Sequence, residues 1–259
     1  MKSLAILTLA AGLACAESPI SPPEIGFIQA ADGTFRPVRG VAANFVLSKP
    51  AASEVVCGAF SGSFGLVKTA SELTLTDAAG KSIASQAAPA GASLFAFALN
   101  GKPALVYFES TKSLLAWNGR SFVAAHVEAS AVVSGSVVSI AAAPAGMAAL
   151  VVERDHGLWE IRVRLDSGAI ASQSAITGVT GPVLLMPSGE ILYGNTGGLM
   201  IRRTDGSEKR ISGRLPKNFA LQPMGAGWIS ISDLDTRRLY AARIVAGQER
   251  FYALPEVSQ

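Results

Sequence analysis

The sequence predicts an all-β fold, a β-propeller of about six blades with four antiparallel strands in each blade. Three observations predict it: turn signals recur about every 40 residues, a leucine-led strand precedes most of these turns, and each unit holds four short strand-like runs. No sustained 3.6-residue periodicity, which would indicate helices, follows the first 16 residues. A sandwich or a barrel with regular strand spacing is the alternative fold.

The turn signals are short segments of Asp, Asn, Ala, Ser and Gly, residue types that suit tight hairpins. Their first residues lie 45, 41, 48, 39 and 41 positions apart. A reversal that recurs at this spacing has the period of a propeller blade. The six turns are Asp32-Gly33, Asp77 to Gly80, Asn118-Gly119, Asp166 to Gly168, Asp205-Gly206 and Ala246-Gly247.

The strand-like runs indicate five full blades between about Glu54 and Glu256. The first runs of each unit are nearly continuous in Ala, Val, Leu and Ile, as in residues 137–143, which is typical of strands buried on both faces. The segment 25–38 adds one hairpin, which matches the last two strands of a blade. We therefore expect an abbreviated N-terminal blade; five blades plus a closing hairpin is the alternative.

The start of the chain has the pattern of an export signal. A short positive start is followed by an apolar run from Leu4 to Ala14 and by the small-x-small motif Ala14-Cys15-Ala16. We expect residues 1–16 to be a signal peptide, residues 17–24 a Pro-rich tether and residues 25–259 the propeller domain, in the periplasm or outside the cell. In an alternative interpretation Cys15 is lipidated and anchors the protein to a membrane.

The composition excludes some function classes. The net charge of +3 is too small to argue for nucleic acid as a partner, and no later apolar stretch is long enough to cross a membrane. Cys57, in an apolar strand context, is expected to be a buried, inert thiol. Five basic residues gather toward the C-terminus, and we interpret them as solvated strand faces rather than an anion site: Arg202, Arg203, Lys209, Arg210 and Arg214.

The opening of the domain contains the segments Gly26-Phe27-Ile28, Asp32-Gly33 and Arg36-Pro37-Val38-Arg39-Gly40. In these residues the chain resembles secreted bacterial β-propellers of an uncharacterised family. The resemblance extends over the predicted mature chain only as a repeat period. The Gly-His and Trp-Asp signature of WD40 blades and the Asp box of sialidase-type propellers are both absent from the sequence. The resemblance therefore implies a fold and an exported location, and it assigns no functional residue.

No catalytic motif stands out: the sequence has neither a Gly-x-Ser-x-Gly elbow nor a phosphate-binding loop. No cofactor is predicted, and no close pair of zinc ligands is present. The loops between the second and third strands of all blades should emerge on one rim, where their polar side chains could bind a sugar or a cation through oxygen atoms. These candidate ligand-binding residues are Glu109, Arg154, Asp155, His156, Asn195, Asp233 and Asp235.

Three functions are compatible with these features. We favour a non-enzymatic binding or scaffold module that uses one propeller face for a protein, a peptide or a glycan. The second is a carbohydrate-active hydrolase or lyase, which would need at least two acidic side chains converging in a pocket. The third is a structural surface protein, favoured if Cys15 is lipidated.

Overall fold

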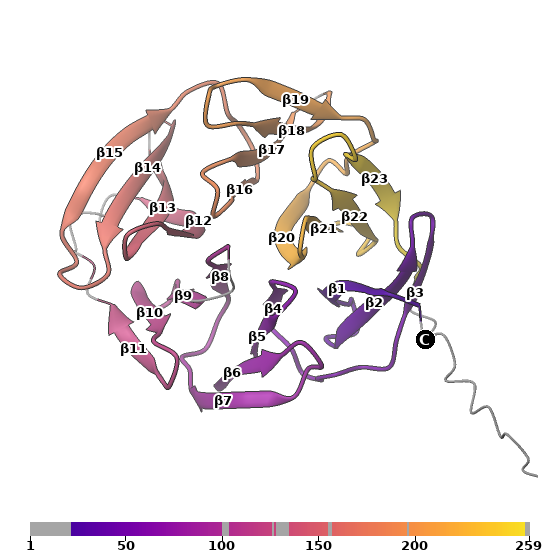
Figure 1. Cartoon of the computed structure of the whole chain (residues 1–259), viewed down its shortest axis with the longest axis horizontal. Coiled ribbons are helices and arrows are strands. Elements are labelled where there is room, and N and C mark those ends of the chain that lie inside the picture. The colour runs from indigo at the N-terminus through magenta and orange to yellow at the C-terminus, as the bar shows by residue number, and fades with distance from the viewer. Residues whose placement is uncertain are drawn as a thin grey trace, which may run out of the picture.

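The computed structural model describes residues 22–99, 104–125, 127, 135–154, 157–195 and 197–256. It is all-β, and its six antiparallel sheets lie around a central axis like the blades of a propeller, as Figure 1 shows. This confirms the predicted fold class and the number of blades. In the described part of the chain, no helix is long and apolar enough to span a membrane.

Five blades have four strands each, paired in the order in which they follow one another along the chain. The second blade comprises β4 (Cys57–Phe60), β5 (Phe64–Lys68), β6 (Glu72–Asp77) and β7 (Ser82–Ala87). The third comprises β8 (Ser93–Phe97), β9 (Ala104–Phe108), β10 (Ser113–Trp117) and β11 (Phe122–Ala125). The fourth comprises β12 (Ser136–Ala143), β13 (Met147–Arg154), β14 (Gly157–Arg164) and β15 (Ile170–Ile176). The fifth comprises β16 (Val183–Leu185), β17 (Ile191–Asn195), β18 (Gly198–Arg202) and β19 (Glu208–Ile211), and the sixth β20 (Phe219–Gly225), β21 (Trp228–Asp233), β22 (Leu239–Arg243) and β23 (Arg250–Ala253).

Burial falls from the axis outward, as the sequence patterns indicate. Every residue of β9 and β16 is buried, whereas β7 and β15 are mostly exposed. Apolar side chains fill the spaces between neighbouring blades: Leu105 of the third blade and Leu150 of the fourth belong to one buried cluster. The core is therefore a ring of layers between sheets, and the strands nearest the axis are held on both faces.

Five of the six turn signals connect the third and fourth strands of a blade, as expected from their period. Their side chains explain why the chain turns there. Asp77 Oδ1 accepts hydrogen bonds from the N–H groups of Ala79 (2.9 Å) and Lys81 (2.8 Å), and Asn118 Oδ1 accepts from the N–H groups of Arg120 and Ser121 (both 2.9 Å). Each side chain thus satisfies backbone donors that the hairpin leaves unpaired.

The N-terminal blade is abbreviated, but by one strand rather than two. It consists of β1 (Glu24–Gln29), β2 (Phe35–Val41) and β3 (Asn44–Leu47). Its Asp32-Gly33 turn lies beside the segment that leads into β4, as the hydrogen bond from Val55 N to Gly33 O (2.7 Å) shows. The end of β1 is therefore on the side of the ring where β4 begins. The start of β1 instead packs against the end of β20.

The strand β1 therefore runs opposite to the innermost strands of the other blades, and the first blade has the second, third and fourth strands of a normal blade. The expectation that Asp32-Gly33 joins the last two strands is wrong for this reason. It connects the strands in the second and third positions, and β3 completes the blade. The innermost strand is the one that the first blade lacks.

Ring closure depends on backbone contact between the first and sixth blades, which lie side by side in Figure 1. A Cβ on Gly26 would collide with Met224 O, and one on Gly225 would collide with Ile25 O. Gly26 also has φ +149°, which side chains rarely allow. Beside this contact, one apolar cluster joins the two blades, with Ile28 and Phe45 on one side and Trp228 on the other.

Candidate functional site

We call the side of the ring that carries the connections between blades the top face. The loops between second and third strands also emerge there, because each four-stranded blade runs alternately up and down. The described candidate residues Glu109, Arg154, Asn195, Asp233 and Asp235 all lie in or beside those loops. Asp155, His156 and Cys15 lie outside the described residues.

Two of the candidates hold their own loops. Asp233 accepts hydrogen bonds from the N–H groups of Asp235 (2.9 Å) and Thr236 (3.0 Å) and from the Thr236 hydroxyl (2.5 Å). The hydrogen bond from the Thr236 hydroxyl is the main reason why the pKa of Asp233 lies below its usual range. Asn195 Oδ1 accepts from Gly197 N at 2.8 Å. Both side chains have the local role that Asp and Asn often have in turns.

The remaining candidates do not converge on one point. The guanidinium of Arg154 lies over the ring of Trp159, 5.7 Å from its centroid. Asp235 accepts a hydrogen bond from Asn218 Nδ2 at 3.3 Å, and Glu109 is exposed after β9. Among the residues that the structure describes, no group of three or more His, Cys, Asp or Glu side chains is placed to hold a metal ion.

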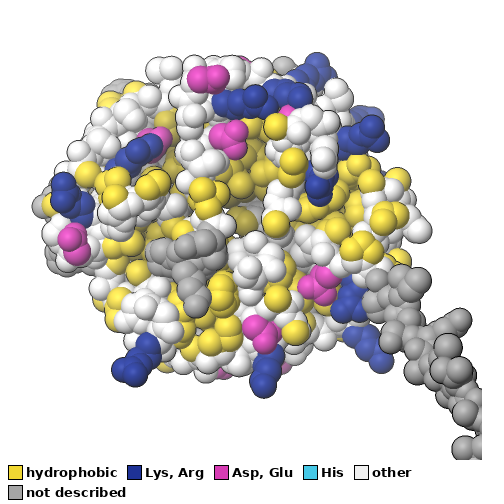
Figure 2. Space-filling model, in the orientation of Figure 1, with side chains coloured by type: hydrophobic (Ala, Val, Ile, Leu, Met, Phe, Trp, Pro, Cys, Tyr) yellow, Lys and Arg dark blue, Asp and Glu magenta, His cyan; other side chains and the backbone are white. Residues whose placement is uncertain are grey.

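A feature that the sequence did not indicate is a cavity of about 600 Å³ along the ring axis, open toward the top face. The innermost strands of the five four-stranded blades all contribute to its wall, and the first blade does not. Hydrophobic side chains also gather around the hollowed centre of the ring on the face drawn in Figure 2. The apolar residues that line the cavity include Phe95, Val138, Ile140, Leu158, Val183, Phe219 and Leu221.

Few polar side chains line this cavity. Ser139 Oγ accepts a hydrogen bond from Leu185 N (2.9 Å) and so ties the fourth blade to the fifth. Ser93 Oγ is buried and has no hydrogen-bond partner of standard geometry among the described atoms. Glu153 is the only carboxylate among the described lining residues. A cavity of this size and lining suits apolar groups, with a few polar atoms to orient them.

Cys57 lies close to Ser93 and is the buried thiol that the sequence predicts. Burial raises the pKa of Cys57 to about 11, and the nearby Lys68 opposes that shift only partly. At neutral pH the thiol therefore stays protonated, and a protonated thiol is a poor nucleophile.

Lys68 is the last residue of β5, beside a loop of the top face, and its side chain is fully buried (0% exposed). Its Nζ donates to Gly91 O (2.8 Å) and Thr69 O (3.0 Å). It thereby ties the connection between the second and third blades to the end of β5. No local signal could have shown this, because Gly91 lies 23 residues away.

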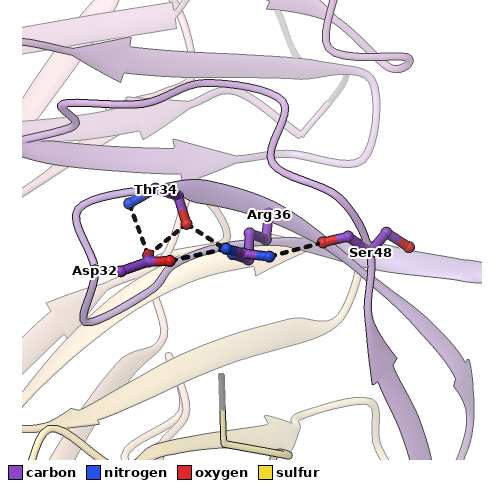
Figure 3. A network of polar contacts seen from close by, with 4 residues as sticks. All are labelled: Asp32, Thr34, Arg36 and Ser48. Atoms are coloured by element: carbon purple, nitrogen blue, oxygen red, sulfur yellow. Dashed lines mark hydrogen bonds and ion pairs between the residues drawn. The ribbon is translucent and has the colours of Figure 1, made fainter. Parts of the chain in front are cut away.

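A compact polar network at the first blade also has a structural role (Figure 3). Arg36 donates from Nη2 to Asp32 Oδ2 (2.8 Å) and from Nε to Thr34 Oγ1 (2.7 Å), and its Nη1 reaches Ser48 O (3.4 Å). The hydrogen bond from the Thr34 hydroxyl is the main reason why the pKa of Asp32 is lowered. The network fixes the β1–β2 turn to the end of the first blade and leaves few groups for a ligand.

Comparisons with known proteins agree on the fold. No family model and no curated protein matches the chain. A chain in the crystal structure of a nidogen/laminin complex is 12% identical, with 90% of this chain and 99% of that chain covered and a TM-score of 0.55. A protein of unknown function from Bacteroides caccae is 13% identical, with 91% and 100% covered and a TM-score of 0.52. At these identities the likeness shows a β-propeller and no function.

Proposed function

We propose that the chain is exported and that its propeller is a non-enzymatic binding module, which takes apolar side chains of a peptide or of a protein segment into the central cavity from the top face. The observation that carries this proposal is the cavity itself. It is about 600 Å³ in volume, is walled by five inner strands and is lined mostly by buried or half-buried apolar side chains. Rigid inner strands make such a site preformed, so that little ordering free energy is lost on binding.

The lining favours a peptide over a glycan. Sugar sites use exposed aromatic faces and many hydrogen-bonding side chains, whereas none of the three tryptophans lines this cavity. Trp117 and Trp228 are buried in the core, and Trp159 is half-buried beneath Arg154. A similar fold is present in a complex of nidogen with laminin, which supports a protein partner at the level of the fold.

Hydrolysis by paired carboxylates has less support. Such a mechanism needs two acidic groups whose environments separate their pKa values. Among the described residues lining the cavity, Glu153 has no second carboxylate beside it. We therefore place the function in recognition.

The test is a selection of random 12-residue peptides displayed on phage, with the mature protein immobilised. Synthetic copies of enriched peptides are then titrated by fluorescence anisotropy. Val138→Trp places a large side chain in the cavity wall, and it should raise the Kd by about tenfold or more. The matched control is Val123→Trp, on the exposed outer strand β11, which should leave the Kd unchanged. Failure to enrich any peptide, or equal binding by Val138→Trp, would contradict the proposal.

Export has a separate test. The mass of the protein purified from an exporting bacterial host should correspond to a chain that begins at Glu17. A chain that begins at Cys15 and carries added diacylglycerol and acyl mass would instead establish the lipid-anchored alternative. An intact Met1 in the purified protein would contradict export.

A further inference from the structure

A second hollow, of about 690 Å³, lies beside the central cavity on the top face of the fifth blade. Its walls come from three segments: residues 180–182, residues around the β17–β18 turn, and residues from the end of β19 to the start of β20. The described residues at the β17–β18 turn are Gly194, Asn195, Gly197 and Gly198. Among its described lining residues there is no carboxylate, and there are three cations: Arg210, Arg214 and Lys217. We call this hollow the basic groove.

Among the described residues, the three cations of the groove have no ion-pair partner, unlike their neighbours. Arg202 pairs with Glu208 (2.7 Å), and Lys209 pairs with Glu249 (2.8 Å). No described residue forms an ion pair with Arg210, Arg214 or Lys217. The basic cluster in the sequence thus divides into a paired part on the blade and an unpaired part that faces one hollow, where the positive potentials add.

One of these cations, Arg210, lies against the backbone of two glycines. A Cβ at Gly197 would lie 3.5 Å from Cζ of Arg210, and one at Gly198 would lie 3.5 Å from its Nε. The guanidinium therefore rests against bare glycine backbone at the groove wall. No hydrogen bond to a described residue uses its donors, so they are available to a ligand. A planar guanidinium fork matches the two oxygens of a carboxylate.

The basic groove continues into the central cavity. Thr180, Gly181, Pro182 and Phe219 line both hollows. One extended ligand can therefore place an apolar side chain in the cavity and an acidic group in the groove.

We propose that the basic groove binds carboxylates of an acidic peptide, whose apolar side chains occupy the central cavity. This inference rests on the proposed function and specifies that the peptide ligand is acidic. An apolar cavity next to three cations that pair with no described carboxylate is complementary to a chain that alternates apolar and acidic side chains. A sulfated glycan would satisfy the cations and leave the apolar wall uncovered.

The test replaces the cations with neutral side chains of similar length. The groove variant Arg210→Gln/Arg214→Gln/Lys217→Gln is compared with Lys49→Gln/Lys81→Gln/Arg120→Gln, which removes the same charge from exposed positions on other blades. Two labelled probes, the peptides selected above and a glutamate decamer, are each titrated at two salt concentrations. A labelled heparin fragment is the third probe.

We expect the selected peptides to be rich in Asp and Glu. The groove variant should weaken binding of the selected peptides and of the decamer by about tenfold or more, and the control by less than about threefold. Wild-type affinity should fall with salt, and the groove variant should lose most of that dependence.

Other outcomes would overturn the inference and leave the proposed function standing. Neutral selected peptides that bind the groove variant as well as the wild type would show that the cations do not contribute. Tighter binding of the heparin fragment than of any acidic peptide, lost in the groove variant, would make the groove a sulfated-glycan site. If no peptide is enriched, the proposed function fails, and equal decamer binding by both triple variants then overturns the groove as well.

Discussion

Replacing Gly225 by alanine should disrupt the contact that closes the ring. The added methyl group would collide with Ile25 O, and its carbon would lie 3.2 Å from Cα of Gly26. These atoms belong to the backbone, so that no side-chain rotation can relieve the collision. The strand β1 would have to move by roughly 1 Å to restore ordinary contact distances.

The structure sets the size of this effect. Overpacking in a tight core costs about 1–3 kcal/mol, and a collision with backbone belongs at the upper end of that range. Movement of β1 would also loosen the apolar cluster that joins Ile28 and Phe45 to Trp228. We therefore expect the free energy of unfolding to fall by about 3 kcal/mol, which for a domain of this size lowers Tm by about 6–12 °C.

The control is Gly247→Ala in the last hairpin. Gly247 has φ +79°, and a Cβ there would meet no atom within 4 Å. Alanine at this position should therefore cost only the strain of a left-handed backbone, about 1–2 kcal/mol. Urea denaturation gives both values, and limited proteolysis between β3 and β4 reports whether the first blade detaches. A Gly225→Ala protein as stable as Gly247→Ala, with unchanged proteolysis, would refute this account of ring closure.

Three further variants test other contacts. Lys68→Ala should lower the free energy of unfolding by about 2–4 kcal/mol in urea titrations, because Thr69 O and Gly91 O lose their donor; a loss below 1 kcal/mol would contradict this role. The pKa of Cys57 is raised from 9.0 to about 11, so the folded protein binds this proton more tightly than the unfolded chain. Between pH 9 and pH 11 the stability of the wild type should therefore fall by about 2 kcal/mol more than that of Cys57→Ala, and parallel pH profiles would argue against this. Asp233→Ala should lower Tm by a few degrees without changing the Kd for selected peptides, because its oxygens bind Asp235 and Thr236; a raised Kd at constant Tm would restore it as a ligand residue.

The blade period could be predicted from the sequence because its signals are local. Asp77 and Asn118 accept hydrogen bonds from residues two to four positions ahead, so the turn is encoded where it occurs. The strand β3 gave no such signal. The hairpin between β2 and β3 turns at Ala42-Ala43, and Ala43 adopts φ +69°. Gly, Asn or Asp is the residue expected in that conformation, so the alanines did not indicate a turn. The first blade therefore looked shorter than it is.

The candidate site was less predictable, since its residues are defined by contacts distant in sequence. The top face follows from topology, and the polar loops lie on it as expected. Burial of Lys68 depends on Gly91, and the pairing of Lys209 depends on Glu249 in another blade. The central cavity is lined by Val and Leu side chains that have the same strand pattern as the core, so sequence alone cannot separate a cavity wall from packing.

The missing strand of the first blade connects ring closure to recognition. Because β1 lacks an inner neighbour, the β4–β5 turn at Gly62 contacts the β20–β21 turn at Ala226. A Cβ added to Gly62 would lie 3.3 Å from Ala226 N. Five inner strands therefore surround the cavity where six would enclose a wider channel. Phe219 and Leu221 lie on β20, the strand whose end Gly225 fixes against β1. Loosening of the closure should consequently change stability and peptide affinity together, whereas Val138→Trp should change affinity alone.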